Sequence, residues 1–116
     1  MRTIIAGSRT IIDYSVVYEA IKESGWMYDI GTIISGGANG VDLLGERWAK
    51  EHSKPITVYK AEWEKFGKQA GYKRNQDMAM DADALIAVWD VKSKGTANMI
   101  SLAESFGLDV FIWRVR

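Results

Sequence analysis

Between a short apolar run and an amphipathic segment lies the stretch Ser35-Gly36-Gly37-Ala38-Asn39-Gly40-Val41-Asp42. The run before it, Thr32–Ile34, has the composition of a buried strand, and Val41, Leu44 and Trp48 then recur at helical spacing. The glycines therefore occupy a predicted strand-to-helix turn. Glycine tolerates positive φ there and lets a ligand approach the backbone, while the amide groups of a helix start attract an anion. Two interpretations follow: a cradle for a phosphate, or a tight turn that needs glycine for its own geometry.

Apolar runs of strand length recur along the whole chain. We predict strands at residues 2–6, 30–35, 56–59, 84–89 and 110–113. Strict alternation of strands with helices indicates a parallel sheet with helices on both faces and right-handed crossovers. The predicted fold class is therefore α/β, a three-layer doubly wound domain with a parallel five-stranded sheet, formed by residues 1–116 as a single domain.

Capping residues mark the predicted helices between these strands. Asp13 caps the first helix and Gly25 ends it, and the second helix begins in the glycine-rich stretch. The third helix covers residues 72–81, and Thr96 caps the fourth. Residues 60–71 form the longest irregular connection, and loops of that length in a compact domain are often functional.

Composition excludes several classes of function. The 116 residues contain no cysteine, which excludes a disulfide framework, a thiolate zinc site and a cysteine nucleophile. The 15 basic and 15 acidic residues cancel, whereas proteins that bind duplex phosphates usually carry a basic excess. No apolar run approaches the length of a membrane span, and we expect a soluble cytoplasmic protein. The lone His52 is interpreted as a solvated residue in the last turn of the second helix.

Small residues follow three of the predicted strands. The turns are Gly7-Ser8-Arg9, residues 35–40 and Ser93-Lys94-Gly95-Thr96. In open parallel sheets, ligands bind beyond the carboxyl ends of the strands, where the strand order reverses. We therefore expect the three turns to meet at one edge of the sheet. Neither the spacing of a Walker A loop nor that of the dinucleotide fingerprint is present.

Arg9 and Asp42 are candidate site residues within these turns. Arg9 follows Gly-Ser at a strand end, where its guanidinium can contact a phosphate through two hydrogen bonds, although an ordinary surface arginine is the alternative. Asp42 fits a helix start in which Asn39 is the cap and the carboxylate reaches back within the first turn. A carboxylate beside a phosphate repels it, so we expect Asp42, if it meets a ligand, to accept hydrogen bonds from sugar hydroxyls or a base amino group.

Cations and amides gather at the end of the long loop and the start of the third helix. Lys68 and Gln69 are placed to close over a ligand from the loop. Arg74 and Asn75 share the first helical turn, and asparagine is unfavourable inside a helix unless its amide is used. A solvated helix face is the alternative, which we assign to Lys73.

The fourth strand ends in Trp89-Asp90, just before the turn at residues 93–96. That turn has the composition of a second anion-binding turn. Trp89 has two interpretations, a stacking surface for a base or a buried core side chain. Asp90 brings a carboxylate to the same region.

Together these motifs resemble one known family. The SLOG superfamily, and in particular its small stand-alone YspA-like branch from bacteria and phages, carries motifs similar to Gly7-Ser8-Arg9, Ser35-Gly36-Gly37-Ala38-x-Gly40-x-Asp42, Gly71-Tyr72-Lys73-Arg74-Asn75, and Trp89-Asp90 with Ser93-Lys94-Gly95-Thr96. The resemblance spans nearly the entire chain. It implies a Rossmann-like five-stranded domain that binds a nucleotide or a nucleotide-derived ligand. Relatives include the cytokinin-activating phosphoribohydrolases, which cleave a nucleotide N-glycosidic bond, and the DNA-processing protein that binds single strands.

One departure from that family bears on activity. The phosphoribohydrolases carry Gly-Thr-x-x-Glu with a catalytic glutamate, whereas here Gly95-Thr96-Ala97-Asn98 is followed by Met99. Glycosidic cleavage needs a carboxylate or an equivalent group. Asp42 and Asp90 are the candidates to replace it, and the resemblance leaves open whether the protein is an enzyme.

Three functional hypotheses follow. The first is a binder of a nucleotide-derived small molecule, a signal sensor or sequestering protein, whose phosphates contact the amide groups of Gly36–Gly40 and Gly95-Thr96. The second is a nucleoside-phosphate N-glycosidase that uses Asp42 or Asp90. The third is a single-stranded nucleic-acid binder, against which the neutral charge argues. We expect no cofactor and no metal, and a homo-oligomer such as a dimer stays open. The candidate ligand-binding residues are Gly7, Ser8, Arg9, Ser35, Gly36, Gly37, Ala38, Gly40, Asp42, Lys68, Arg74, Asn75, Asp90, Ser93, Lys94, Gly95 and Thr96.

Overall fold

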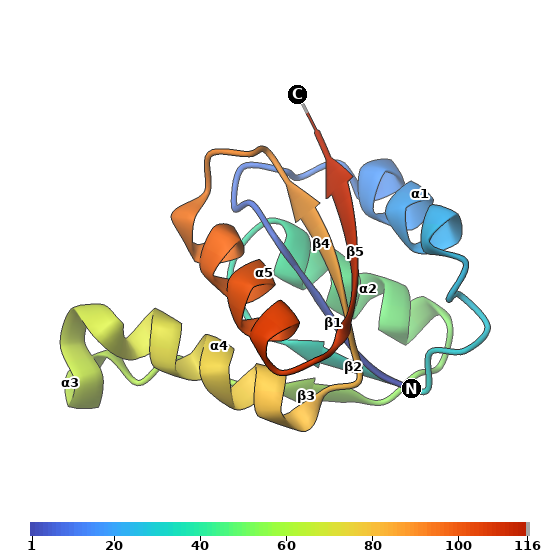
Figure 1. Cartoon of the computed structure of the whole chain (residues 1–116). Helices are drawn as coiled ribbons and strands as arrows, with labels where there is room; N and C mark the ends of the chain where they lie inside the picture. The colour runs from blue at the N-terminus through green and yellow to red at the C-terminus, as the bar shows by residue number, and fades with distance from the viewer. Residues whose placement is uncertain (116) are drawn as a thin grey trace.

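The computed structural model describes residues 1–115, along which strands alternate with helices (Figure 1). The elements are β1 (Arg2–Gly7), α1 (Tyr14–Ser24), β2 (Thr32–Ser35), α2 (Val41–Glu51), β3 (Ile56–Val58), α3 (Trp63–Phe66), the 3-10 turn η1 (Gly67–Gln69), α4 (Ala70–Asp81), β4 (Ala84–Trp89), α5 (Lys94–Ser105) and β5 (Asp109–Arg114). Every predicted strand is present, and β4 has the predicted bounds. None of the helices within residues 1–115 combines the length and the apolar character needed to cross a membrane.

The five strands form one parallel sheet in the order β3-β2-β1-β4-β5. This confirms the predicted α/β class and its Rossmann-like, doubly wound arrangement. The order runs outward from β1 on one side and from β4 on the other, so the strand order reverses between these two neighbours. At such a switch point the loops that leave the two strands diverge to opposite faces and open a crevice at the carboxyl edge.

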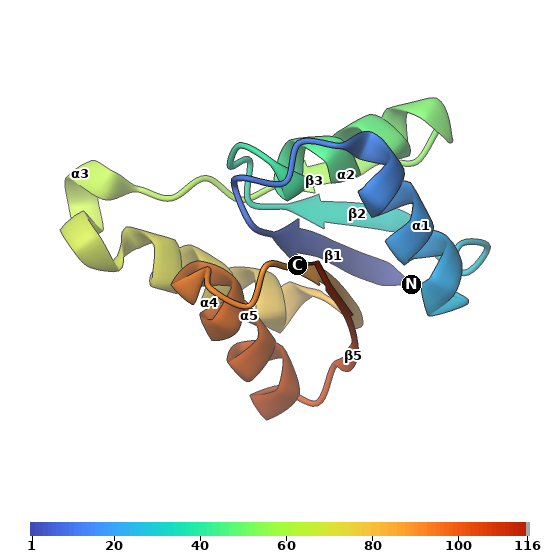
Figure 2. The same ribbon diagram turned by 90° about the horizontal axis from the view of Figure 1, so that it is seen from above.

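Helices cover both faces of the sheet, α1 and α2 on one and α4 and α5 on the other (Figure 2). Alternate residues of each strand face opposite layers, as the period of a strand requires. Ile5 packs with Trp48 of α2 in the first layer, whereas Ile4 packs with Met78 and Met99 in the second. All five of these side chains are almost completely buried, which explains why these strands have no polar alternation.

The connection between β3 and β4 departs most from prediction. Residues 60–71 were expected to be irregular, yet most of them form α3 and η1, and α4 begins two residues earlier than predicted, at Ala70. Gly67 adopts a φ of +58°, which lets the chain turn sharply between the two short helical segments. Figure 1 and Figure 2 show this segment projecting beyond the body of the molecule. We call α3 and η1, residues 63–69, the arm.

Two helix starts also differ from prediction. The cap of α2 is Gly40, at a φ of +78°, rather than Asn39. A Cβ at Gly40 would lie 2.5 Å from the carbonyl oxygens of Ser8 and Arg9, so the close approach of the two turns requires glycine. The cap of α5 is Ser93, not the predicted Thr96, because the Ser93 hydroxyl accepts a hydrogen bond from the Thr96 amide at 3.3 Å.

Candidate functional site

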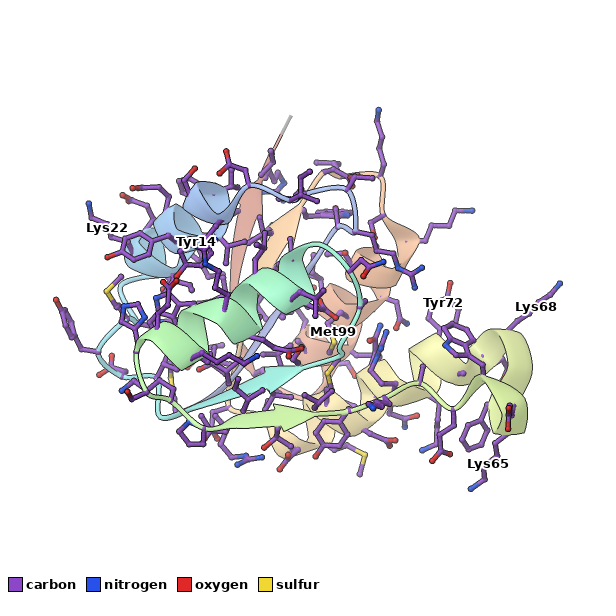
Figure 3. All side chains as sticks on the ribbon, turned by 180° about the vertical axis from the view of Figure 1, so that it is seen from behind. Tyr14, Lys22, Lys65, Lys68, Tyr72 and Met99 are labelled. Atoms are coloured by element: carbon purple, nitrogen blue, oxygen red, sulfur yellow. The ribbon has the colours of Figure 1, made fainter. Side chains whose placement is uncertain are left out.

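The turns that follow β1, β2 and β4 meet at the carboxyl edge of the sheet, beside the switch point. Together with α4 they enclose a cavity of about 80 Å3, which we call the switch-point cavity. It is lined by Ala6, Gly7, Arg9, Ala38, Asp42, Arg74, Asn75, Met78, Ser93, Gly95, Thr96 and Met99. Figure 3 shows Met99 inside the molecule, whereas Lys68 lies far out on the arm.

The turn after β1 joins the other two turns. A Cβ at Gly7 would overlap the carbonyl oxygen of Val88 in β4, so glycine is required there by the packing of the strands. Ser8 is buried, and its hydroxyl accepts a hydrogen bond from the Asp90 amide at 3.0 Å. Its carbonyl oxygen accepts one from the Val41 amide at 3.4 Å. Gly7 and Ser8 therefore hold the three turns in register.

In the glycine-rich turn after β2, nearby side chains already form hydrogen bonds with two backbone amides. The buried Ser35 hydroxyl donates to a Glu46 carboxylate oxygen at 2.7 Å and accepts from the Gly37 amide at 3.1 Å. The Ala38 amide donates to Asp42 Oδ2 at 3.2 Å. Two of the amides that were expected to hold a phosphate, those of Gly37 and Ala38, are therefore already occupied by side chains.

Asp42 is a buried carboxyl group on the wall of the cavity, with only 5% of the residue exposed. Burial raises its pKa to about 6, although the hydrogen bond from Ala38 and the charge of Arg74 lower it. A Cβ on Gly36 would lie 2.8 Å from Asp42 Oδ2, so the carboxyl group sits directly under the glycine-rich turn. A carboxyl group that titrates near neutral pH can exchange a proton with a ligand.

Arg74 and Arg9 bring two cations to the same cavity. Arg74 is half-buried; its Nη1 donates to the Gly36 carbonyl oxygen at 2.8 Å and its Nε donates to Asn75 Oδ1 at 3.1 Å. Two of the five guanidinium N–H donors are thus used, and three are left for a ligand. Burial lowers the pKa of Arg74, the nearby Asp42 raises it, and Arg9 lowers it further. Arg9 is exposed and forms no ion pair within residues 1–115.

In the turn after β4, the Asp90 carboxylate binds backbone amides of its own turn. Asp90 Oδ1 accepts hydrogen bonds from the Lys92 and Ser93 amides, both at 2.8 Å. These bonds lower the pKa of Asp90, and its side chain does not line the cavity. Of the two carboxylates considered for catalysis, the structure brings only Asp42 to the cavity.

The start of α5 has two free amide groups, and one of them belongs to Gly95, a residue of the cavity wall. The Lys94 and Gly95 amides form no hydrogen bond with residues 1–115, whereas the Thr96 amide is capped by Ser93. Asn75 holds this end of the helix in place, since its Nδ2 donates to the Gly95 carbonyl oxygen at 3.2 Å. A Cβ at Gly95 would meet nothing within 4 Å, so packing within the protein does not require glycine there.

A second cavity of about 340 Å3, which we call the arm-side cavity, shares the walls Arg9, Ala38 and Arg74 with the first. Its remaining walls are Gly36, Gly37, Asn39, Lys60, Ala61 and Trp63. Sequence reasoning missed Lys60 and Trp63. Both residues follow β3, and all strands of a parallel sheet end at the same edge. Their position in the sequence could therefore have predicted that they lie near the other turns.

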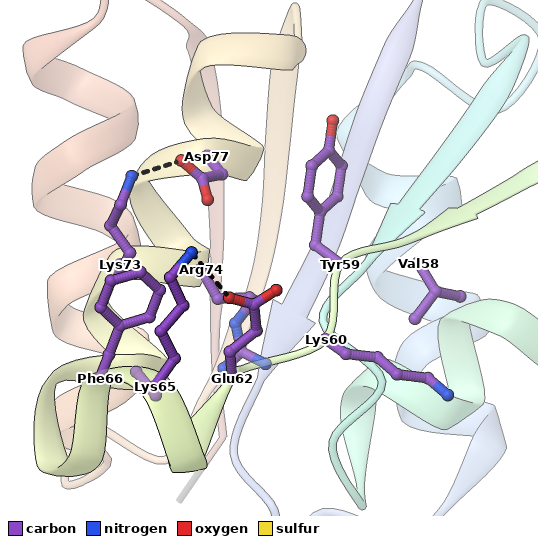
Figure 4. A pocket seen from close by; sticks show the side chains of 10 residues that line it. Val58, Tyr59, Lys60, Glu62, Lys65, Phe66, Lys73, Arg74 and Asp77 are labelled. Carbon is purple, nitrogen blue, oxygen red and sulfur yellow. Dashed lines mark hydrogen bonds and ion pairs between the residues drawn. The ribbon is translucent and has the colours of Figure 1, made fainter.

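A larger groove of about 600 Å3 runs along the other side of the arm (Figure 4). Four of its six charged side chains pair with one another, Lys73 with Asp77 at 3.0 Å and Lys65 with Glu62 at 3.9 Å, and the other two are Lys60 and Arg74. This internal pairing, and the absence of Arg9 from the groove wall, leave the groove less suited to an anion than the two cavities that share Arg9.

The structure divides the candidate residues into three groups. Those on the cavity walls are Gly7, Arg9, Gly36, Gly37, Ala38, Asp42, Arg74, Asn75, Ser93, Gly95 and Thr96. Ser8, Ser35 and Gly40 lie behind the walls and support the turns. The side chains of Lys68, Asp90 and Lys94 are not brought to either cavity. Within residues 1–115, no three acidic or histidine side chains gather closely enough to hold a metal ion.

Comparison with known proteins adds two similarities. The model of the YspA, cpYpsA-related SLOG family matches residues 1–66, which include the turns after β1 and β2. The Gene 61 protein of Mycobacterium phage D29 is 32% identical, with 94% of this chain and 93% of that protein covered. A search of the solved structures gives no significant match.

Proposed function

Because the chain belongs to the YspA, cpYpsA-related SLOG family, we propose that it binds a nucleotide-derived small molecule, as a sensor or a sequestering protein. A phosphate of the ligand occupies the switch-point cavity, between Arg9, Arg74 and the start of α5. Asp42 and Asn75 line the same cavity and face the sugar.

The observation that carries this proposal is the convergence of unused donors on one small cavity. Arg9 has no ionic partner among residues 1–115, and Arg74 retains three of its five N–H donors. The free amide of Gly95, on the cavity wall, adds the positive end of the α5 dipole. In a protein of zero net charge, this concentration of donors favours an anionic guest of phosphate size.

Calorimetry with AMP tests the proposal. Arg9→Ala is expected to weaken AMP binding by about tenfold or more, because a hydrogen bond to a charged group contributes roughly 1.5–3 kcal/mol. The fold should be nearly unaffected, since Arg9 is exposed. Lys22→Ala removes one cation from the exposed surface of α1, away from the cavities, and serves as the control. Equal AMP affinity for wild type and Arg9→Ala contradicts the proposed role of Arg9.

A second candidate function, hydrolysis of a nucleoside-phosphate N-glycosidic bond, is favoured by Asp42. A buried carboxyl group with a pKa of about 6 can transfer a proton near neutral pH or stabilise a developing sugar cation. Incubation with AMP and ADP-ribose, followed by chromatography for free base, separates the two functions. Released adenine that disappears in Asp42→Asn favours the enzyme, and a bound, intact nucleotide favours the binder.

A further inference from the structure

We propose that Trp63, on the arm, is the platform on which the base of the bound nucleotide stacks, with the base in the arm-side cavity. This inference rests on the proposed function, because it assumes that the phosphate lies between Arg9 and Arg74. It adds a specificity-determining residue that comes from outside the three turns. It also assigns a role to the arm, which otherwise adds little to the core of the protein.

Trp63 is the most exposed of the tryptophans, and the core does not account for it. It is 54% exposed, whereas Trp48 is completely buried. Trp26 and Trp113 pack against the hydrophobic core, and Trp89 Nε1 donates to the Ser93 carbonyl oxygen at 3.0 Å. A large aromatic face open to a cavity is the surface that a nucleobase stacks on.

The indole of Trp63 is held beside Arg74 on the first turn of α4. A Cβ at Gly71 would lie 3.6 Å from Trp63 Cη2 and 4.0 Å from Arg74 Nη2, so both side chains flank the same bare position of the helix. The aromatic face and the cation therefore border one continuous space. A ligand whose phosphate contacts Arg74 can reach Trp63 with the rest of its structure.

The sizes of the two cavities agree with this orientation. The switch-point cavity, about 80 Å3, has room for a group the size of a phosphate, whereas the arm-side cavity, about 340 Å3, reaches the range of small-molecule sites, roughly 300–1,000 Å3. The arm-side cavity is lined by Arg9, Lys60 and Arg74 and by no carboxylate. Because Arg9 and Arg74 line both cavities, a ligand whose phosphate contacts them in the first cavity can extend into the second.

The test compares AMP with ribose 5-phosphate, which shares the phosphate and the sugar but lacks the base. In calorimetry, Trp63→Ala is expected to weaken AMP binding about 5- to 150-fold, the range reported for removal of one base–aromatic stack. The affinity for ribose 5-phosphate should stay unchanged, and Trp63→Phe should keep most of the affinity for AMP. Phe66→Ala is the matched control, because Phe66 is an exposed aromatic of the same short helix that lines the groove on the other side.

The outcomes separate the inference from the function on which it rests. If AMP and ribose 5-phosphate bind and Trp63→Ala leaves the AMP affinity unchanged, or weakens both ligands equally, the stacking role is overturned and the proposed phosphate site stands. If the wild-type protein binds neither AMP, ADP-ribose nor ribose 5-phosphate, the proposed function fails and the stacking role fails with it.

Discussion

Replacement of Asp42 by asparagine measures the free-energy cost of burying this carboxyl group in its charged form. The side chain is 5% exposed and accepts a hydrogen bond from the Ala38 amide at 3.2 Å. Asparagine has nearly the same shape, and its carbonyl oxygen can accept the same bond. The substitution therefore removes the charge while it keeps the packing, and any pH-dependent difference in stability reports on the carboxyl group.

The expected size of the effect follows from the pKa. Burial raises the pKa of Asp42 from 3.8 to about 6, roughly two units, which corresponds to about 3 kcal/mol. Between these two values the folded state holds the proton that the unfolded state has lost, so the contribution of Asp42 to stability falls as the pH rises. Below pH 3.8 Asp42 is protonated in both the folded and the unfolded state, so its burial no longer lowers stability. The free energy of unfolding of Asp42→Asn, relative to wild type, should therefore increase by up to about 3 kcal/mol from pH 3.5 to pH 7.5.

Urea denaturation at a series of pH values measures this difference. All other groups titrate in both proteins, so the difference between the two curves isolates Asp42. A difference in the free energy of unfolding that is the same at every pH reflects a change of packing. Only the part of the difference that varies with pH reports on the pKa of Asp42. Asp29→Asn, which removes an exposed carboxylate, controls for the loss of one negative charge. Parallel pH profiles for wild type and Asp42→Asn refute the raised pKa.

Two glycine substitutions distinguish a glycine that leaves room for the ligand, Gly95, from one that the fold requires, Gly40. Gly95→Ala should leave stability unchanged or raise it by about 0.4–1 kcal/mol, because the Cβ meets nothing within 4 Å. The same methyl group narrows the cavity, so AMP affinity should fall in calorimetry; unchanged affinity argues against a ligand beside α5. Gly40→Ala should destabilise by at least about 2 kcal/mol in urea denaturation, because its Cβ would lie 2.5 Å from the Ser8 and Arg9 carbonyl oxygens. Gly25→Ala has a similar φ of +79° but open space around it, so it should cost only about 1–2 kcal/mol, and equal losses at the two positions contradict the steric account.

The centre of the sheet was predictable from sequence because β1, β2 and β4 are buried on both faces. Unbroken apolar runs such as Ala84–Trp89 have no other plausible location than the middle of a parallel sheet. Once the strands alternate with helices, the turns that follow them must meet at one edge. That reasoning placed Arg9 and Gly95 around one space, and the neighbouring Asn75, whose amide is unfavourable inside a helix unless it is used, drew attention to Arg74.

The exact polar contacts were not predictable, because they depend on backbone geometry that residue types do not fix. Asp90 looked like a candidate catalyst, but its carboxylate binds the two amides of its own turn, at Lys92 and Ser93. The glycine-rich turn looked like an open cradle, but Ser35 and Asp42 occupy two of its amides.

The arm was missed for a different physical reason. Its charged residues suit a solvated loop and a short solvated helix equally well, and a helix of four residues has no apolar period to detect. Trp63 was therefore not predicted as a site residue, and its position beside the arm-side cavity appears only in three dimensions.

A titration with AMP followed by 1H–15N correlation spectroscopy tests the central claim most directly, because it locates the ligand residue by residue. The largest shifts should fall on the backbone amides of Lys94 and Gly95 and on the side-chain Nε signals of Arg9 and Arg74. Shifts confined to other parts of the surface, or a spectrum that AMP leaves unchanged, contradict the claim that this edge of the sheet binds a nucleotide-derived phosphate.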